Sequence, residues 1–265
     1  MRYTKGLVNE FTVENIKVYI YESFEEMGKS AAFDASAELV RLQKEQDEIN
    51  VMFAAAASQI SLLDALCASN EIHFSKVNAF HMDEYAGLSG KDPRSLAYYL
   101  TSRHLDRLQL RYTFFIDAEC TDTEAVCLEY EQVLKAHPLD IAFLGIGDNG
   151  HIAFNEPHIA DFQDPRWVKT VEIDDVSKQQ QVNAGNFPAM KDVPSLAYTV
   201  TIPPLMSAKR VFCTVPGKAK AGATCNALTA EISEQCPASI LRRHSNISLY
   251  LDRDSASKLT PLIEN

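Results

Sequence analysis

The stretch "LGIGDNGHIAFNEP", residues 144–157, decides the fold because it joins an apolar run to a dense group of polar side chains. The run "DIAFLGIG" (140–147) is typical of a buried strand. Glycines, an acid and an amide follow it at once, and then come His151 and Glu156. A plain turn needs fewer polar groups than this. The stretch therefore indicates a functional site at the end of a strand.

Length and composition fit one globular α/β domain over residues 1–265. The chain has 46% hydrophobic and 23% charged residues, and it contains no repeat or Pro/Gly/Ser-rich linker. Its formal net charge of -11 argues against a general nucleic-acid surface, which needs a basic face. A small anionic ligand such as a sugar phosphate can still bind through local groups.

Cysteine usage and hydropathy point to a cytoplasmic protein. The six cysteines form no CxxC pair and show no zinc spacing, so we expect reduced thiols and no metal site. The N-terminal segment lacks the apolar core of a signal peptide, and no apolar run is long enough to span a membrane. We therefore expect no membrane partner.

Strand-like and helix-like segments alternate along the chain. Strands are predicted at 15–23, 48–55, 76–83, 111–117, 140–147, 167–173, 196–202, 210–217 and 246–252, and helices at 24–46, 58–69, 93–108, 121–137 and 217–230. This alternation predicts a three-layer, Rossmann-like α/β fold with a mostly parallel sheet and helices on both faces. Ligands of such sheets bind at the carboxyl ends of the strands.

Two of these strand ends carry candidate site residues. After the strand at 48–55, Ala57 and Ser58 begin a predicted helix with Ser58 as its N-cap, where free N–H groups can hold phosphate; a close-packed turn is an equally good interpretation. The end of the strand at 76–83 carries His81 and Asp83, and Glu84 and Tyr85 follow directly. Adjacent carboxylates point in different directions, so we expect one to face a substrate and the other to pack or pair. A lone acid there would more often be a helix cap.

Two further strand ends complete the set. In the opening stretch, Gly147 and Gly150 allow close approach to a ligand, and His151 lies five positions before Glu156, near enough for a His–carboxylate pair. The loose fingerprint "GIGDNG" is a poor fit to a dinucleotide site, because no acidic residue follows about 20 positions later in a first βαβ unit. In "VPGKAKA", Lys218 and Lys220 begin a predicted helix, which is unfavourable beside the helix dipole unless an anion lies nearby. A solvated basic helix start is the alternative.

The motifs "FHMDEYAGL", "LGIGDNGHIAFNEP" and "VPGKAKA", in this order, resemble glucosamine-6-phosphate deaminases, also called isomerases, of the superfamily shared with 6-phosphogluconolactonases. The resemblance covers most of the chain. It implies isomerisation of glucosamine 6-phosphate to fructose 6-phosphate with release of ammonia and with no cofactor. It also implies that Asp83 is the base that moves a proton between C2 and C1, that His151 opens the sugar ring with Glu156 as its partner, and that Lys220 binds phosphate with Lys218 as an additional charge.

The chain departs from that family in three places, so we expect a divergent member. Where many deaminases have Thr-Gly-Gly-Thr, this chain has "AAAASQ", which keeps Ser58 as a hydroxyl. The order Asp148-Asn149-Gly150-His151 puts an amide where well-studied members have a carboxylate. The segment 173–190 lacks the family's phosphate arginine, for which Lys178 or Gln180 is a substitute. These changes affect phosphate recognition more than the chemistry of Asp83 and His151.

Three functions stay open on this evidence. The first is the deaminase/isomerase, the second is a lactonase-like hydrolase or an isomerase of another sugar phosphate, and the third is a non-catalytic sugar-phosphate sensor. Family members often assemble, so the resemblance also implies a homo-oligomer.

Overall fold

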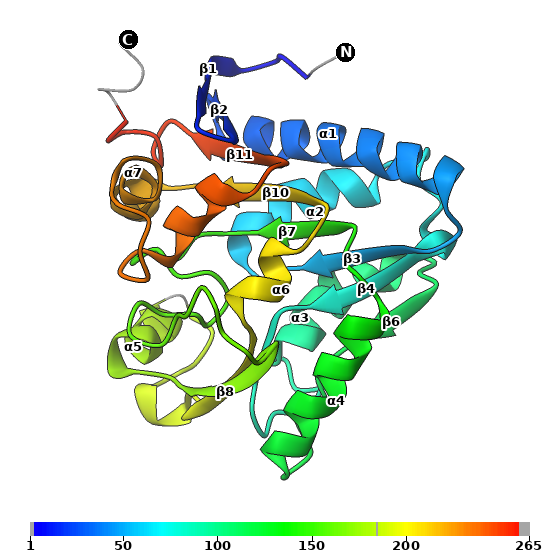
Figure 1. The fold of residues 1–265 in the computed structure, drawn as a ribbon, viewed down its shortest axis with the longest axis vertical. Helices are drawn as coiled ribbons and strands as arrows, with labels where there is room; N and C mark the ends of the chain where they lie inside the picture. The colour runs from blue at the N-terminus through cyan, green and yellow to red at the C-terminus, as the bar shows by residue number, and fades with distance from the viewer. Residues whose placement is uncertain (1–2, 184, 260–265) are drawn as a thin grey trace.

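A computed structural model of the chain describes residues 3–183 and 185–259 and is drawn in Figure 1. Its main sheet has eight strands in the order β1-β2-β11-β10-β7-β3-β4-β6. Their bounds are β1 (Leu7–Val13), β2 (Ile16–Tyr21), β3 (Ile49–Phe53), β4 (Val77–His81), β6 (Tyr112–Phe114), β7 (Ile141–Leu144), β10 (Arg210–Val215) and β11 (Ile247–Asp252). Only the β1–β2 pair is antiparallel in this sheet, which confirms the predicted mostly parallel arrangement.

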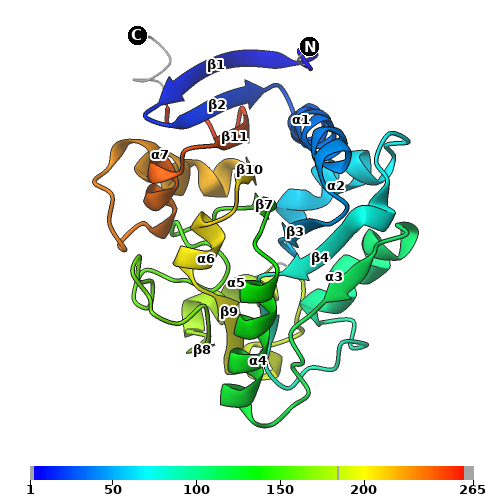
Figure 2. The ribbon, with the colours of Figure 1, turned by 45° about the vertical axis from the view of Figure 1, so that its right-hand side comes forward.

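Helices cover both faces of the main sheet, as predicted (Figure 2). One face carries α1 (Phe24–Glu45), α2 (Ile60–Cys67) and α3 (Leu96–Arg103), and the other carries α4 (Thr123–Ala136), α6 (Ile202–Met206) and α7 (Ala221–Thr229). Alternate strand residues divide between the two cores: Val51 and Phe53 pack on the α1 side, whereas Met52 packs on the α4 side. The main sheet is thus buried on both faces, in the three-layer architecture that the sequence predicted.

Helix α1 illustrates how local sequence sets these layers. It begins after Ser23, whose hydroxyl accepts a hydrogen bond from the Glu26 amide at 3.3 Å. Its buried face includes Met27, Leu39 and Leu42, so the apolar stripe predicted from the sequence is the one that meets the sheet. Burying each large side chain of this kind contributes about 1.5–3 kcal/mol.

A second, smaller sheet lies beside the main one. It consists of β5 (Asp83–Tyr85), β9 (Leu196–Val200) and β8 (Val168–Glu172) in the order β5-β9-β8, with both pairs antiparallel. It has its own apolar cluster, which includes Tyr85, Val171 and Phe187. Helix α5 (Asp175–Asn183) follows β8. Because β5 starts two residues after β4 ends, the chain passes from the main sheet to the small one at Asp83.

The remaining described elements are short 3₁₀ turns: η1 (Ala57–Gln59), η2 (Phe74–Lys76), η3 (Leu105–Arg107), η4 (Met190–Asp192), η5 (Lys218–Lys220) and η6 (Pro237–Arg243). The prediction that Ser58 caps a helix was wrong. Ser58 lies inside η1, and α2 begins at Ile60, two residues after Ser58, with Gln59 at its N-cap position. None of the described helices is both long and apolar enough to cross a membrane.

Candidate active site

His151 lies in the loop that follows β7, the loop expected from the opening motif. Gly150 has a φ of +91° and Ala153 a φ of +53°, so the chain bends sharply on both sides of the histidine. Gly147 is buried directly under the imidazole, because a Cβ at Gly147 would lie 2.2 Å from the His151 ring. Glycine at 147 is therefore required by the position of the histidine, and it leaves no space for a larger residue there.

His151 and Glu156 form the predicted pair. The Nδ1 atom of His151 lies 3.0 Å from Oε1 of Glu156, and the two side chains are 23% and 5% exposed. The same Nδ1 atom lies 2.9 Å from Oδ1 of Asn149. With two acceptors facing it, Nδ1 carries the ring proton, which leaves Nε2 as the basic nitrogen.

Asn149 joins the two members of this pair. Its Oδ1 also accepts from the His151 amide at 3.1 Å, and its Nδ2 donates to Oε2 of Glu156. Both oxygens of Glu156 are thereby engaged. The amide that departs from the family pattern is thus a bridge between His151 and Glu156.

Glu156 stays ionised although it is buried. Burial alone raises its pKa, but hydrogen bonds from His151, Asn149 and Ser177 outweigh it and lower the pKa to about 2. The Ser177 hydroxyl, on α5, donates to Oε1 at 2.9 Å. Glu156 is therefore a fixed negative charge beside the His151 ring.

Asp83 is the other candidate catalyst, and its carboxylate is free. Asp83 is half-buried, and its carboxylate makes no hydrogen bond or ion pair with any residue within the described ranges. Burial raises the pKa of Asp83 to about 7, and the charge of Glu84 is the smaller cause. An unpaired carboxylate with such a pKa is suited to take and return a proton near neutral pH.

Glu84 has a structural role, so only one of the adjacent acids is available to a substrate, as predicted. It accepts hydrogen bonds from the amides of Tyr85, Leu96 and Ala97 and from the Ser95 hydroxyl, at 2.7–3.0 Å. These bonds hold the start of α3 against β5. The third polar residue of this strand end, His81, is buried in the core, where burial lowers its pKa to about 3.

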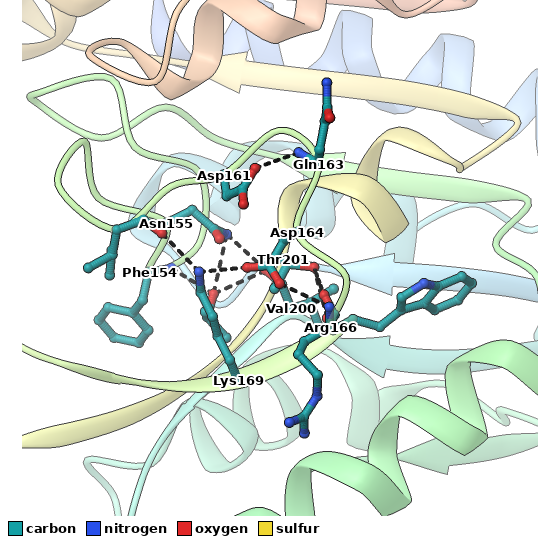
Figure 3. Close-up of polar contacts among 12 residues, drawn as sticks. Phe154, Asn155, Asp161, Gln163, Asp164, Arg166, Lys169, Val200 and Thr201 are labelled. Atoms are coloured by element: carbon teal, nitrogen blue, oxygen red, sulfur yellow. Dashed lines mark hydrogen bonds and ion pairs between the residues drawn. The ribbon is translucent and has the colours of Figure 1, made fainter.

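Strand β9 holds Asp83 and the histidine loop together. Asp83 pairs with Thr199 in the small sheet, and the Thr199 hydroxyl accepts a hydrogen bond from the Phe154 amide at 3.1 Å. The buried amide of Asn155 donates to the carbonyls of Ile152 at 2.9 Å and Val200 at 2.8 Å. Figure 3 shows these contacts of the loop with β9. Two segments that are distant in sequence therefore meet on one strand.

The chain after Glu156 is fastened in the same region, as Figure 3 also shows. Lys169 on β8 donates to the Ile159 carbonyl and to Asp164, both at 2.8 Å. Thr201 donates to the Arg166 carbonyl at 2.7 Å. These bonds close the loop between β7 and β8 onto the small sheet, so the position of His151 does not depend on β7 alone.

The residues predicted to bind phosphate lie at the ends of three adjacent strands, β3, β7 and β10. Ser58 reaches the end of β7, since a Cβ at Gly145 would lie 2.9 Å from its hydroxyl. The buried Gln59 side chain donates to the Leu144 carbonyl at 3.0 Å and to Thr214 at 2.9 Å, which ties all three strand ends together. Ala57 is exposed at the start of η1.

Lys220 already has an anionic partner, because its ammonium forms an ion pair with Asp148. Lys218, in the same turn, is exposed. Lys178 lies on α5, and the side chain of Gln180, its suggested alternative, is outside the described residues.

Ser177, Thr199 and Asn155 were not identified from the sequence. Only Asn155 carried a signal, since it lies inside the "AFNEP" motif. Among the described residues, no group of three or more His, Cys, Asp or Glu side chains is arranged to hold a metal ion.

Comparison with known proteins agrees with this geometry. The family described as glucosamine-6-phosphate isomerases/6-phosphogluconolactonase matches residues 22–250. A glucosamine-6-phosphate deaminase of Listeria welshimeri is 33% identical over 231 residues, which are 87% of this chain and 97% of that protein. One from Bacillus cereus is 36% identical over 188 residues, 71% of this chain and 70% of the relative.

Solved structures give the same result. A monomeric glucosamine-6-phosphate deaminase superposes with a TM-score of 0.82 at 31% identity, covering 91% of this chain and 99% of that chain. A 6-phosphogluconolactonase from Thermotoga maritima has a TM-score of 0.73 at 16% identity over 89% of this chain and 99% of its own, which shows a shared fold. The chain therefore belongs to the family of glucosamine-6-phosphate isomerases and 6-phosphogluconolactonases.

Proposed function

We propose that this protein is a glucosamine-6-phosphate deaminase, which converts glucosamine 6-phosphate and water to fructose 6-phosphate and ammonia. The observation that carries the proposal is the free carboxylate of Asp83, with its pKa raised to about 7, on a strand that pairs with β9, which also holds the His151 loop. Relatives with this activity at 33–36% identity support the same conclusion.

We assign one proton transfer to each of the two bases, and the geometry of the site supports this assignment. Nε2 of His151 takes the proton of the C1 hydroxyl and returns it to the ring oxygen, while Glu156 and Asn149 hold the Nδ1 proton and orient the ring. Asp83 then removes the proton from C2 of the open sugar and delivers it to C1, while the C1 oxygen gains a proton and the 2-amino group loses one. Water adds to the resulting C2 imine, and ammonia leaves. Ring opening and the transfer from C2 to C1 therefore use separate bases.

The phosphate of the substrate is assigned to the ends of β3, β7 and β10. Amide groups near Ala57 and Ser58 and the ammonium of Lys220 supply donors and positive charge there, with Lys218 nearby. Gly147 contributes close backbone approach, since its own amide donates to the His151 carbonyl at 2.9 Å. We further propose a cytoplasmic enzyme that acts without a metal or organic cofactor. The predicted homo-oligomer stays a prediction, and light scattering of the purified chain measures its mass; a similar solved structure is of a monomeric deaminase.

The test is release of ammonia and fructose 6-phosphate from glucosamine 6-phosphate. Wild type is expected to turn over, and Asp83→Asn is expected to lower kcat by about 10²–10⁴, the usual contribution of a general base. Asp106→Asn, an exposed position in η3, is the matched control and should keep wild-type activity. Absence of turnover by the wild type, or full activity of Asp83→Asn, would reject the proposal.

A second candidate function is that of an isomerase or lactonase acting on another sugar phosphate. The altered loop "AAAASQ" and the Lys220–Asp148 pair favour it, because both change the place where the phosphate is expected to bind. A panel that includes 6-phosphogluconolactone separates the two, because lactone hydrolysis releases acid and no ammonia. Binding of a sugar phosphate without any turnover would favour the non-catalytic sensor.

A further inference from the structure

The ion pair between Lys220 and Asp148 joins the groups that follow two neighbouring strands. Lys220 occupies the N-cap position of α7 after β10, and Asp148 lies in the loop after β7. Their side chains are 27% and 37% exposed, so the pair is open to solvent. An ion pair with this exposure exchanges readily with a dissolved anion, because its stabilisation is small.

Asp148 supplies a negative charge that Lys220 otherwise needs from outside. Among the described residues, the first turn of α7 contains no acidic side chain, and no side chain caps its N-terminus. Lys220 is thus a cation at the positive end of a helix, which an anion stabilises. In this structure that anion is Asp148, at the place assigned to the phosphate of the substrate.

We infer that Asp148 is an intramolecular competitor for the anionic group of the substrate at Lys220, and so an affinity-setting residue. The inference rests on the proposed function, since that function assigns the phosphate to Lys220. Every anion that binds there must first displace Asp148, so its apparent dissociation constant equals the intrinsic one divided by the fraction of Lys220 that is free of Asp148. A weakly held monoanion then fails to bind, whereas a phosphate monoester, with nearly two negative charges, still displaces the carboxylate.

Calorimetric titration with inorganic phosphate, at fixed ionic strength and pH, tests this directly. Asp148→Asn is expected to bind phosphate about fivefold more tightly than the wild type, the factor that a partly exposed ion pair supplies. Lys220→Met should weaken binding, and in the Lys220→Met background the Asp148→Asn change should have no effect. Asp106→Asn removes the same charge far from this pair and should leave the affinity unchanged.

Equal affinity of wild type and Asp148→Asn would overturn the inference. A gain that persists in the Lys220→Met background would also overturn it, because competition for Lys220 would then not be the cause. So would a failure of phosphate to bind either protein.

The calorimetric result is independent of turnover, which separates this inference from the proposed function. If phosphate affinity responds as expected but no ammonia is released, competition at Lys220 stands and the deaminase proposal fails. If ammonia is released and phosphate affinity does not respond, the reverse holds. In an active enzyme, the Asp148→Asn variant should also show a KM for glucosamine 6-phosphate lowered by about the same fivefold factor.

Discussion

At the scale of single residues, Asp83 and Glu84 show how neighbours in sequence take opposite roles. Glu84 accepts four hydrogen bonds and holds α3 in place, whereas the Asp83 carboxylate has no partner among the described residues. The fixed charge of Glu84 also opposes ionisation of Asp83. One side chain therefore positions the segment and helps to tune the base beside it.

This arrangement predicts a pH profile. Asp83 acts as a base only when it is ionised, so kcat/KM should rise with pH and level off above a midpoint near 7. Glu84→Gln removes the nearby charge and should move the midpoint to lower pH, but not to the ordinary value of aspartate, because burial is the larger cause and stays. Initial rates measured about two pH units on each side of 7 give the midpoints of the wild type and of Glu84→Gln.

Circular dichroism of Glu84→Gln is the control, since loss of the α3 start would change the fold instead of the ionisation. A wild-type midpoint near 4, or an upward movement in Glu84→Gln, would contradict this assignment.

The sequence predicted the His151–Glu156 pair and the split between Asp83 and Glu84, because short motifs fix what lies within a few residues. It did not predict that Asn149 bridges the pair or that Asp148 meets Lys220. The first depends on the bend between Gly150 and Ala153. The second joins residues 72 positions apart, whose proximity is set by the order of β7 and β10 in the sheet.

At the scale of elements, β9 is the part of the fold that assembles the site. Thr199 pairs with Asp83 in the small sheet, and its hydroxyl accepts a hydrogen bond from the Phe154 amide of the histidine loop. Thr199→Val keeps the shape of the side chain but leaves this half-buried amide without its acceptor. We expect a loss of about 1–3 kcal/mol in the free energy of unfolding, together with a lower kcat.

Urea denaturation and steady-state kinetics measure these two effects. Thr199→Ser is the matched control, because it keeps the hydroxyl and should retain most of the stability and activity. If Thr199→Val behaved like Thr199→Ser, the hydroxyl would not be what holds the loop.

Hydrophobic patterns predicted most of the helices and strands, but they predicted less of how the strands pair with one another. The strands at 167–173 and 196–202 were found, yet their sequence does not say that they pair with each other and with β5 in a separate sheet. Strand β1 was missed because its side chains alternate only between half-buried and exposed positions at a sheet edge. Pairing is decided by distant parts of the chain, which local periodicity does not contain.

At the scale of the whole molecule, the raised pKa of Asp83 has a cost in stability. The folded state holds the Asp83 proton more tightly than the unfolded state, so this group loses stabilisation as pH rises from about 4 to about 7. Asp83→Asn resembles the protonated form at every pH. It should therefore raise the free energy of unfolding, by about 4 kcal/mol at pH 8 and by less at pH 5.

Denaturation of both proteins at the two pH values checks this expectation, and Asp106→Asn is the exposed control. Glu156 has the opposite sign, since its lowered pKa stabilises the fold above its ordinary value and that contribution is lost as pH falls toward 2. A variant Asp83→Asn that is less stable than wild type at pH 8 would contradict the assignment.

The site draws on two sheets of very different size. His151 follows β7 of the eight-stranded sheet. Asp83 and the β9 residues that hold the His151 loop belong to a three-stranded sheet with a small apolar cluster of its own. Smaller cooperative units open at lower free energy than the main core. Heating should therefore abolish activity at a temperature below that at which the whole chain unfolds. Inactivation that reverses on cooling would indicate that the small sheet had opened while the large sheet stayed folded.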